Sequence, residues 1–411
     1  MMNNITQLSG ELQKLLTETA DEIAVATRFV KRKRIVTGSD FVQGVVFGLM
    51  NEPDATRRQL HIAYSRNSPD SITAEGFDQR FRVEAVTFLQ RMVEEALKLR
   101  LKIQMGRSFG ILGQFNGVYV LDGTKVWVND SQQHLLTRLN LTTGEMIWQQ
   151  RAEKRHENHF ALTHAPLPVG SLRLADLGFF HLDSFAQLSQ EGVYWLTRYK
   201  SRTTLYTLDG QPLDIQALLQ AGDVDCAVLV GQQRLAARLV AHPVPTYVTQ
   251  KRQRKHLHKA QRKQKKVSPS VLSLSGWTIF LTSIPDLDFD EVEALARARW
   301  QIERVFKLWK SFFRLPHALS DRPIRLMCLF WAKLLVILIA HWMMTLDPRS
   351  FPERSLWLTA QVIQSFAFSL FDALAHLSRI CQVLRRFKAT LARVSTLSKR
   401  GSRKLTFQLL A

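Results

Sequence analysis

One apolar stretch limits how this chain can fold more than any other feature. Residues 327–344 read MCLFWAKLLVILIAHWMM, an 18-residue run close to the shortest length that crosses a bilayer. Lys333 and His341 interrupt the run, and a lysine in the middle of a bilayer is costly. A helix at the centre of a large core can be apolar on nearly all sides. The favoured interpretation is a core helix, and a membrane span is the alternative.

The charge of the chain indicates the kind of partner it binds. Its 411 residues include 56 Lys and Arg against 35 Asp and Glu, which gives a net charge of +21 and a pI near 10.2. Such a chain suits a polyanion, because each Lys or Arg that neutralises a phosphate releases a bound counterion. Nucleic acid is the first candidate partner, and an anionic membrane surface is the second.

The cysteines and the N-terminus indicate the cellular compartment of the protein. Cys226, Cys328 and Cys381 are scattered, with no CxxC motif and no Cys/His pairing. This pattern indicates a reducing compartment and argues against a zinc site. The N-terminal MMNNITQLSGELQKLL lacks a basic region followed by an apolar core, so export is not expected. A cytoplasmic protein is predicted.

Residues 1–105 are predicted to form a helical domain that binds DNA. A second helix is expected to open at Asp40, with Gln43 placed as in a capping box. The KRKR run at 31–34 is interpreted either as a solvated charged face or as a direct DNA contact. Within residues 71–100, apolar residues recur at spacings of three and four, as on one face of a long helix: Phe77, Phe81, Ala85, Phe88, Met92 and Ala96.

From about residue 110 the pattern changes to short strand-like runs. GVYVLDGTKVWV (117–128) is predicted as two runs around an Asp-Gly turn, and residues 134–150 as a hairpin that turns at TTG. Residues 171–180 and 192–200 are further strand-like runs, separated by the helix-like HLDSFAQLSQ. Strands with an intervening helix indicate a mixed α/β sheet.

Residues 203–274 combine short strand-like pieces with a strongly basic segment. KRQRKHLHKAQRKQKK (251–266) holds nine Lys or Arg in 16 residues. We predict a basic loop that is mobile without a partner and closes on a phosphate backbone, because so many like charges repel unless they are neutralised. A solvated, disordered loop is the alternative. The candidate DNA contacts in this loop are Lys251, Arg252, Arg254 and Lys255.

A strand and a long helix are predicted next. GWTIFLTSIP (276–285) is strand-like, and the helix that follows contains ARARWQIERVFKLWKS (296–311). Helical spacing places Arg299, Glu303 and Lys310 on one face. The simpler interpretation of this face is an ordinary surface, on which an i,i+4 ion pair is worth about 0.2–0.5 kcal/mol.

The second interpretation brings two other carboxylates to Glu303. Asp122 follows VYVL and Asp176 follows LRLA, so each ends an apolar strand-like run. A carboxylate there is costly unless it is paired, hydrogen-bonded or bound to a metal, although a lone Asp-Gly is more often a turn. Two such aspartates and a helical glutamate, in so basic a chain, favour a divalent-metal site for phosphoryl transfer.

Three blocks of the sequence resemble DDE transposases of bacterial insertion sequences, in the family numbered four. They are VLDGT around Asp122, LADLGFF with YWLTRYKS around Asp176 and Arg198, and WTIFLTSIP with RWQIERVFKLWKS around Glu303. With similar N-terminal helical residues, they cover most of residues 30–345. The resemblance implies that Asp122, Asp176 and Glu303 are catalytic and bind two Mg2+ ions, with Mn2+ as a substitute.

The last block is the most specific. The family signature is Tyr, two residues, Arg, three residues, Glu, six residues and Lys. Arg299, Glu303 and Lys310 match it in spacing, whereas Ala296 stands where the tyrosine belongs. The resemblance implies that basic residues position DNA phosphates around the carboxylates, namely Arg198, Arg299, Lys307 and Lys310.

Two tryptophans are candidates for contacts with bases. Trp277 lies just before the last strand, where relatives with an insertion can stack a tryptophan on a base flipped from the transposon end. Trp300, beside Arg299, is the second candidate. The alternative for both is core packing, because tryptophans at strand starts and on helices usually pack.

The resemblance implies an α/β fold with a ribonuclease H-like, retroviral-integrase-like mixed-sheet core. This core would comprise residues 106–202 and 275–345, and residues 203–274 would be a β-rich insertion that carries the basic loop. The flanking parts would be the N-terminal helical domain and a C-terminal helical segment, residues 346–411, that serves in dimerisation.

The implied function is cut-and-paste transposition. The steps would be 3′ nicking at the element ends, attack of the freed hydroxyl on the opposite strand to form a hairpin, hairpin opening and strand transfer. The partners would be double-stranded DNA, with its terminal inverted repeats and target, and a second copy of the chain, with no membrane. The alternatives are a catalytically inactive DNA-binding derivative, suggested by Ala296, and a basic peripheral membrane protein that uses residues 327–344.

Overall fold

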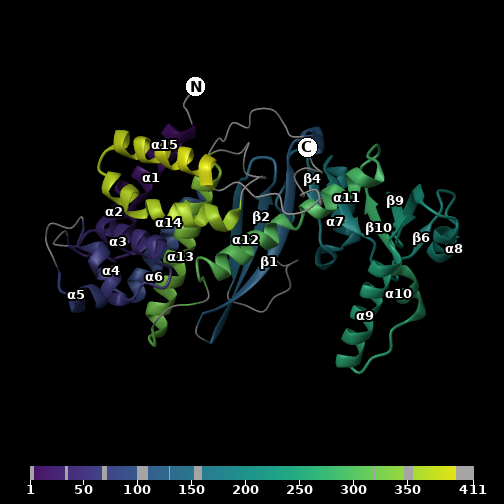
Figure 1. Cartoon of the computed structure of the whole chain (residues 1–411), viewed down its shortest axis with the longest axis horizontal. Coiled ribbons are helices and arrows are strands. Elements are labelled where there is room, and N and C mark those ends of the chain that lie inside the picture. The colour runs from purple at the N-terminus through teal and green to yellow at the C-terminus, as the bar shows by residue number, and fades with distance from the viewer. Residues whose placement is uncertain are drawn as a thin grey trace.

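The structure is a computed structural model of a mixed α/β protein, in which one sheet crosses the middle and right of the view and a helical bundle lies at the left (Figure 1). The mixed α/β class predicted above is confirmed. The residues described are 4–32, 36–66, 72–99, 110–128, 130–151, 160–315, 317, 320–346 and 355–394.

Five strands form one half of the sheet, in the order β3-β2-β1-β4-β5. β1 pairs antiparallel with β2 and parallel with β4, and β5 continues parallel to β4. The predicted hairpin at TTG is confirmed, because β2 and β3 are antiparallel and Gly144, at φ +73°, donates its N–H to the Asn140 carbonyl at 2.8 Å. The bounds are β1 Val118–Val128, β2 Ser131–Asn140, β3 Met146–Arg151, β4 Leu172–Leu174 and β5 Tyr194–Arg198.

The predicted turn at Asp122-Gly123 is wrong. β1 runs through both residues, and Asp122 pairs with Thr137 while Gly123 pairs with Leu136 of β2. The continuous ladder to β2 outweighs the local turn preference of an Asp-Gly pair. Asp122 therefore lies inside a strand. The run at 171–180 is also shorter than predicted, because β4 ends at Leu174 and a short 3-10 turn, Leu177–Phe179, follows.

The segment between β5 and the last predicted strand extends the same sheet. The order continues as β10-β9-β8-β6-β7, and β10 pairs antiparallel with β5 on one side and with β9 on the other. The strand predicted at 276–285 is confirmed as β10. The bounds are β6 Leu205–Tyr206, β7 Pro212–Leu213, β8 Val224–Val230, β9 Leu235–Pro243 and β10 Trp277–Thr282.

Fifteen α-helices accompany these strands in the described residues. Nine of them lie before β1 or after α12, and these form the bundle with α13 at its centre (Figure 1). The bounds are α1 Asn4–Leu16, α2 Glu18–Ala26, α3 Gly38–Asn51, α4 Arg57–Tyr64, α5 Ala74–Asp78, α6 Val83–Lys98, α7 Leu182–Gln190, α8 Ile215–Gln220, α9 Thr246–Arg262, α10 Pro269–Leu274, α11 Phe289–Ala298, α12 Gln301–Ser311, α13 Pro323–Met344, α14 Leu356–Ala373 and α15 Leu377–Val394.

Two N-terminal predictions need correction. The long helix expected over 71–100 is two helices, α5 and α6, because the chain bends after Asp78, whose buried carboxylate accepts a hydrogen bond from Arg325 Nη1 at 2.7 Å. The helix expected to open at Asp40 begins at Gly38. Its cap is Thr37, whose side chain accepts from the Asp40 N–H, and Gln43 instead donates to the Leu16 carbonyl at 2.7 Å.

The long apolar run is a core helix, as favoured above. α13 has the length and composition of a membrane span, but 78% of its most apolar window is buried inside the protein. Its polar side chains are hydrogen-bonded to backbone carbonyls, Lys333 to that of Arg314 at 2.9 Å and His341 to that of Gly144 at 2.6 Å. Burial lowers the pKa of Lys333 to about 8 and also lowers the pKa of His341.

The two faces of the sheet belong to different cores. Val118 and Val120 of β1 pack into the larger core with α12 and α13, whereas Leu121 packs into a second core with residues of α7. Because side chains alternate along a strand, Asp122 lies on the α12 face. The fold thus places one member of the predicted site beside α12.

The basic segment and the helix around Glu303 also differ from prediction. Residues 246–262 form the helix α9 and not a loop, and α9 projects as an arm at the lower right of the view (Figure 1). The single long helix expected after Pro285 is broken at Arg299 and Trp300 into α11 and α12. Asp288 caps α11 in a capping box with Glu291.

Candidate active site

Three elements bring the predicted carboxylates together. Asp122 projects from the middle of β1, and its Oδ1 accepts the Gly123 N–H at 2.8 Å. Asp176 lies two residues beyond the end of β4, at the start of the 3-10 turn, and its side chain is half exposed. Glu303 lies in the first turn of α12, which packs its apolar face on the sheet.

Arg299 joins the three carboxylates. Its Nη2 donates to Glu303 Oε1 at 3.0 Å, and its guanidinium lies 3.9 Å from Asp122 Oδ2 and 3.9 Å from Asp176 Oδ1. The Arg299 side chain is only 19% exposed, so water screens these interactions less than it screens those of a surface pair. The pair of Arg299 and Glu303 is therefore part of a four-residue cluster, and the plain surface interpretation is incomplete.

The cluster has the donor chemistry of a site for a hard divalent cation. Three carboxylates supply oxygen ligands only, which Mg2+ and Mn2+ prefer. Across the described residues, no group of three His, Cys, Asp or Glu side chains lies close enough to hold an ion as it stands. The Arg299 guanidinium contacts all three carboxylates, so a metal ion bound by them would have to displace it.

The predicted basic contacts lie on two elements, α12 and β5. Lys307 is exposed on α12, while Lys310, further along the same helix, is half buried, and burial lowers its pKa. Arg198 is exposed at the end of β5. Lys307 and Lys310 thus lie on the helix that carries Glu303, and Arg198 lies on β5, the strand next to the one that precedes Asp176.

The two tryptophans differ from the expected ranking. Trp277, the stronger candidate for base stacking, is half buried at the start of β10 and packs against the second core. Trp300 is 61% exposed at the junction of α11 and α12, next to Arg299. Trp300 therefore has the open face that stacking requires.

Two side chains beside Glu303, Arg304 and Trp357, were not among the site residues predicted from the sequence. A hollow next to Glu303 is lined by Trp300, Arg304, Lys307 and by Trp357 of α14. Trp357 is 48% exposed, and its ring meets Phe312 edge-on with centroids 5.1 Å apart. Nothing in the sequence around Trp357 indicates this position, because it depends on how α14 packs beside α12.

Three of the four candidate residues on α9 face solvent. Lys251, Arg254 and Lys255 are exposed, and no residue of this helix is buried. Arg252 instead turns inward, where its guanidinium donates to the Trp277 carbonyl at 2.7 Å and to Thr278 Oγ1 at 3.1 Å. Burial lowers the pKa of Arg252, and Arg198 lowers it further. Arg252 thus anchors the arm to β10.

Two basic runs can be described only in part. Lys31 lies 4.0 Å from Glu84, but residues 33 and 34 of the KRKR run fall outside the described residues. The basic C-terminal tail beyond Val394 also falls outside them. The DNA contact considered for the KRKR run stays a prediction.

Comparison with known proteins identifies the family. A family model described as "Transposase DDE domain" matches residues 114–339, more than half of the chain and the whole region that carries the carboxylate cluster. The chain belongs to the DDE transposase family. Members of this family are enzymes that cleave DNA and transfer strands, and they use divalent metal ions.

The transposase is similar over its full length to curated relatives. It is 25% identical to the transposase for insertion sequence element IS231F of Bacillus thuringiensis subsp. israelensis, over 97% of this chain and 94% of the relative. It is 23% identical to the transposase for insertion sequence element IS1151 of Clostridium perfringens, over 97% of this chain and 95% of the relative. A shorter match, 25% identical over 36% of this chain, is to a putative transposase InsL of Escherichia coli K12.

Proposed function

We propose that this transposase moves an insertion sequence by cut-and-paste chemistry, with Asp122, Asp176 and Glu303 as its catalytic carboxylates. The observation that carries the proposal is the convergence of all three on the Arg299 guanidinium, within 3.9 Å. The three lie far apart in the sequence, and the fold brings them to one point on one face of the sheet. That arrangement is the one a metal-dependent phosphoryl-transfer site requires.

The strand order supports a ribonuclease H-like core. In such a core, a meander of three antiparallel strands is followed by two strands parallel to the first. The order β3-β2-β1-β4-β5 has this pattern. We accordingly propose residues 106–202 and 275–345 as the core and residues 203–274 as an insertion, which here continues the sheet through β10 and β9.

The carboxylates would hold two Mg2+ ions, with Mn2+ as a substitute. When bound, such ions supply Lewis acidity at the scissile phosphate and lower the pKa of a bound water. The reaction is an in-line displacement at phosphorus. A water or a DNA 3′-hydroxyl forms the new P–O bond as the bond to the leaving oxygen breaks, so no covalent link to the protein forms.

Arginines and lysines of the site would hold the DNA. Arg299 would move from the carboxylates to a phosphate, and Lys307, Lys310 and Arg198 would add further phosphate contacts. Phosphate contacts of this kind fix the register of the DNA, and they stabilise negative charge in the transition state. Trp300, as the exposed tryptophan, is the better candidate to stack on a flipped base during hairpin formation, and Trp277 remains the second.

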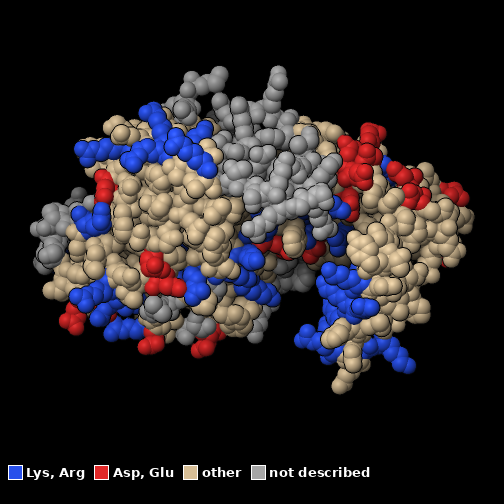
Figure 2. All heavy atoms as spheres, in the orientation of Figure 1, with Lys and Arg blue, Asp and Glu red and all other residues tan. Residues whose placement is uncertain are grey.

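The surface supports a path for duplex DNA. Figure 2 shows Lys and Arg gathered over α12 and over α9, on the two sides of a hollow in the lower part of the molecule. The exposed Lys251, Arg254 and Lys255 contribute to the α9 side. We propose that the duplex lies in this hollow with its backbone toward both helices, because a basic groove tracks a phosphate backbone.

We also propose that two copies of the chain pair the two element ends, and that the protein acts on DNA in the cytoplasm without a membrane. In the described part of residues 346–411, α14 packs on α3 and α15 packs on α1 of the same chain. Contacts between two copies would therefore use the outer surfaces of these helices. A pair of copies would bring two terminal inverted repeats together.

A catalytically inactive DNA-binding relative is the second candidate. Ala296 stands on α11, one turn before Arg299, and is partly buried against the core, so this position offers no hydroxyl to a phosphate. The three intact carboxylates favour the active enzyme over this alternative.

Plasmid cleavage tests the proposal. A plasmid that carries the native element ends is incubated with the full chain and Mg2+ or Mn2+, and wild type is compared with Glu303→Gln and Glu293→Gln. Glu303→Gln should bind the ends and lower the cleavage rate by on the order of a thousandfold or more, because a metal ligand is lost. Glu293→Gln removes a carboxylate that pairs with Arg297 on α11, so cleavage should stay at the wild-type rate.

The two candidate functions predict different outcomes. Binding without cleavage by wild type in either metal would favour the inactive protein. Recovery of nicked ends alone, with no hairpins under any condition, would remove the hairpin step and leave the rest of the proposal in place.

A further inference from the structure

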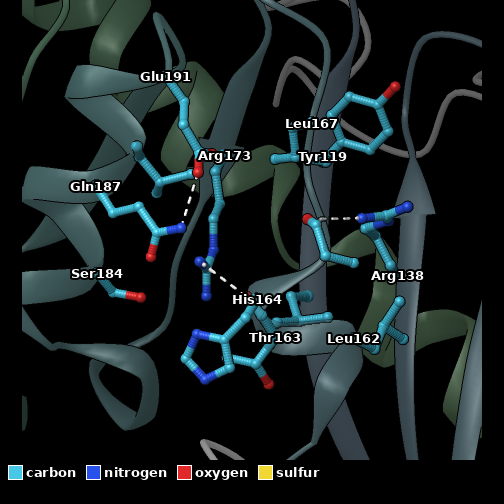
Figure 3. Close-up of a pocket in the computed structure, with 13 residues that line it drawn as sticks. Tyr119, Arg138, Leu162, Thr163, His164, Leu167, Arg173, Ser184, Gln187 and Glu191 are labelled. Carbon is cyan, nitrogen blue, oxygen red and sulfur yellow. Dashed lines mark hydrogen bonds between the residues drawn. The ribbon is translucent and has the colours of Figure 1, made fainter.

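A second polar pocket lies on the face of the sheet opposite the carboxylates. Figure 3 shows Arg173 of β4 in its centre, Ser184 and Gln187 of α7 on one side, and Arg138 of β2 on the other. The proposed catalytic chemistry does not use these side chains. The pocket has a volume of about 430 Å3 when its open mouth is included.

Arg173 is buried, and in the described part of the chain it has no carboxylate partner. The residue is 5% exposed, and its Nη1 donates to the Thr163 carbonyl at 3.3 Å. Its Nη2 is buried and has no hydrogen-bond partner. Among the described residues, no Asp or Glu forms an ion pair with this guanidinium.

The electrostatic surroundings of Arg173 increase the cost of its charge. Burial, together with the nearby positive charge of Arg138, lowers the pKa of Arg173 to about 10. At neutral pH the guanidinium is still protonated, so the protein holds a positive charge away from water. An uncompensated buried charge of this kind is strongly destabilising unless an anion pairs with it.

Among the described residues, no neighbouring carboxylate is ion-paired with Arg173. Glu191 lines the pocket, but its Oε1 accepts a hydrogen bond from Gln187 Nε2 at 2.7 Å (Figure 3). Arg138 donates to the Ala165 carbonyl at 3.3 Å. The remaining polar groups at the wall include the Ser184 hydroxyl and the His164 ring, both of which can donate a hydrogen bond.

We propose that this pocket binds a compact phosphate-type oxyanion, with Arg173 as its main ligand. A tetrahedral oxyanion offers several acceptor oxygens to the planar guanidinium fork and to the hydroxyl beside it. The enclosed part of the pocket is small, so the ligand is a single phosphate group and not a whole nucleotide. The phosphate comes either from free orthophosphate or from a DNA backbone, and both share this chemistry.

The first experiment measures the binding of orthophosphate to the full chain. Isothermal titration calorimetry, at constant ionic strength and without metal or DNA, compares wild type with Arg173→Met and Arg173→Lys. The dissociation constant should rise about 10- to 100-fold in Arg173→Met, because a charge-assisted hydrogen bond is lost. Arg173→Lys, which keeps the charge but not the fork, should lie between the two. Arg58→Met removes the same charge from an exposed position on α4 and should bind as wild type does.

Thermal unfolding provides a second readout that does not depend on a measurable heat of binding. Phosphate should raise the Tm of wild type and leave that of Arg173→Met unchanged, because only a ligand that binds the folded state stabilises it. In phosphate-free buffer, Arg173→Met should be at least as stable as wild type, since a buried unpaired charge has been removed. Equal responses of wild type and Arg173→Met to phosphate would overturn the proposal, as would no response in either.

Competition then separates the two sources of phosphate. If saturation with a duplex oligonucleotide abolishes the binding of orthophosphate, a DNA phosphate occupies the pocket. If phosphate binds the DNA complex with an unchanged dissociation constant, the ligand is free phosphate. None of these measurements requires cleavage, so an inactive enzyme would leave the test of this pocket intact.

Discussion

The two faces of one sheet carry opposite imbalances of charge. On the α12 face, Arg299 is surrounded by three carboxylates, and the cluster has an excess of negative charge. On the α7 face, Arg173 has no carboxylate partner among the described residues and has Arg138 nearby. The first face therefore suits an added cation and the second an added anion. The difference shows that a buried arginine indicates a ligand only after its neighbours are known.

The pH dependence of stability at Lys333 would measure the free energy of burying a cation that has no direct hydrogen bond to a carboxylate. Its Nζ donates to two backbone carbonyls and lies 3.9 Å from Asp54 Oδ1. Burial lowers its pKa from 10.5 to about 8. The unfolded chain therefore holds this proton between pH 8 and 10.5 while the folded chain releases it. Stability should accordingly rise with pH across this window, by about 3 kcal/mol.

Chemical unfolding at several pH values between 7.5 and 10.5 measures this effect. The free energy of unfolding of Lys333→Met is subtracted from that of wild type, because tyrosines and cysteines titrate in both. The difference should change in favour of wild type as the pH rises through 8. A difference that stays constant would show that the carbonyls keep the ammonium charged, and would weaken the argument that Arg173 needs an anion.

Arg299→Gln tests whether the carboxylate face binds a cation in place of the guanidinium. The guanidinium competes with a divalent ion for the same three carboxylates, so its removal should tighten the binding of Mn2+ to the DNA-free chain by about tenfold. Electron paramagnetic resonance of free Mn2+ gives the dissociation constant. Arg297→Gln is the matched control, because Arg297 pairs with Glu293 outside the cluster. Unchanged or weaker binding in Arg299→Gln would mean that the arginine does not occupy the metal position.

Substitutions of the exposed lysines on the arm α9 should have the smallest effect of these changes, a change in the salt dependence of DNA binding, since these charges are solvated. Lys251→Ala and Lys255→Ala should each reduce the slope of log K against log salt by about 1 for a duplex oligonucleotide. Gln250→Ala changes an exposed, uncharged side chain of the same helix, so its slope should stay at the wild-type value. If the outward lysines have no effect on the slope, the duplex does not contact α9.

Local sequence patterns and the family resemblance together suggested Asp122, Asp176 and Glu303 as one site, and their shared contact with Arg299 agrees with that suggestion, while their catalytic role stays a prediction. Asp122 and Asp176 interrupt apolar strand-like runs, and helical spacing alone puts Glu303 and Arg299 on one face. The sequence did not predict that Asp122 lies inside β1, because pairing with β2 is a long-range contact that overrides the Asp-Gly turn preference. The sequence also could not show that Arg299 sits between all three carboxylates.

Most of the remaining differences between the sequence predictions and the structure depend on which side chains are exposed to solvent. Trp277 and Trp300 look alike in sequence, and only the packing around β10 and α12 makes the second the exposed one. The basic segment was predicted as a loop from its charge, although its Lys, Arg, Gln, Leu and Ala residues favour a helix. The arginine within SLRLADLGFF could have been noticed as a charged residue in an apolar strand run, which is the one signal that the sequence offered for Arg173.

Because the sheet is continuous, paired strands connect the arm α9 to the proposed catalytic site. Arg252 fastens α9 to β10, β10 is hydrogen-bonded to β5, and β5 to β4, which leads directly into Asp176. If the duplex contacts α9 as proposed, a displacement of the arm would be passed along paired strands to the segment that carries Asp176. DNA binding by the arm would then affect the distances between Asp176, Asp122 and Glu303.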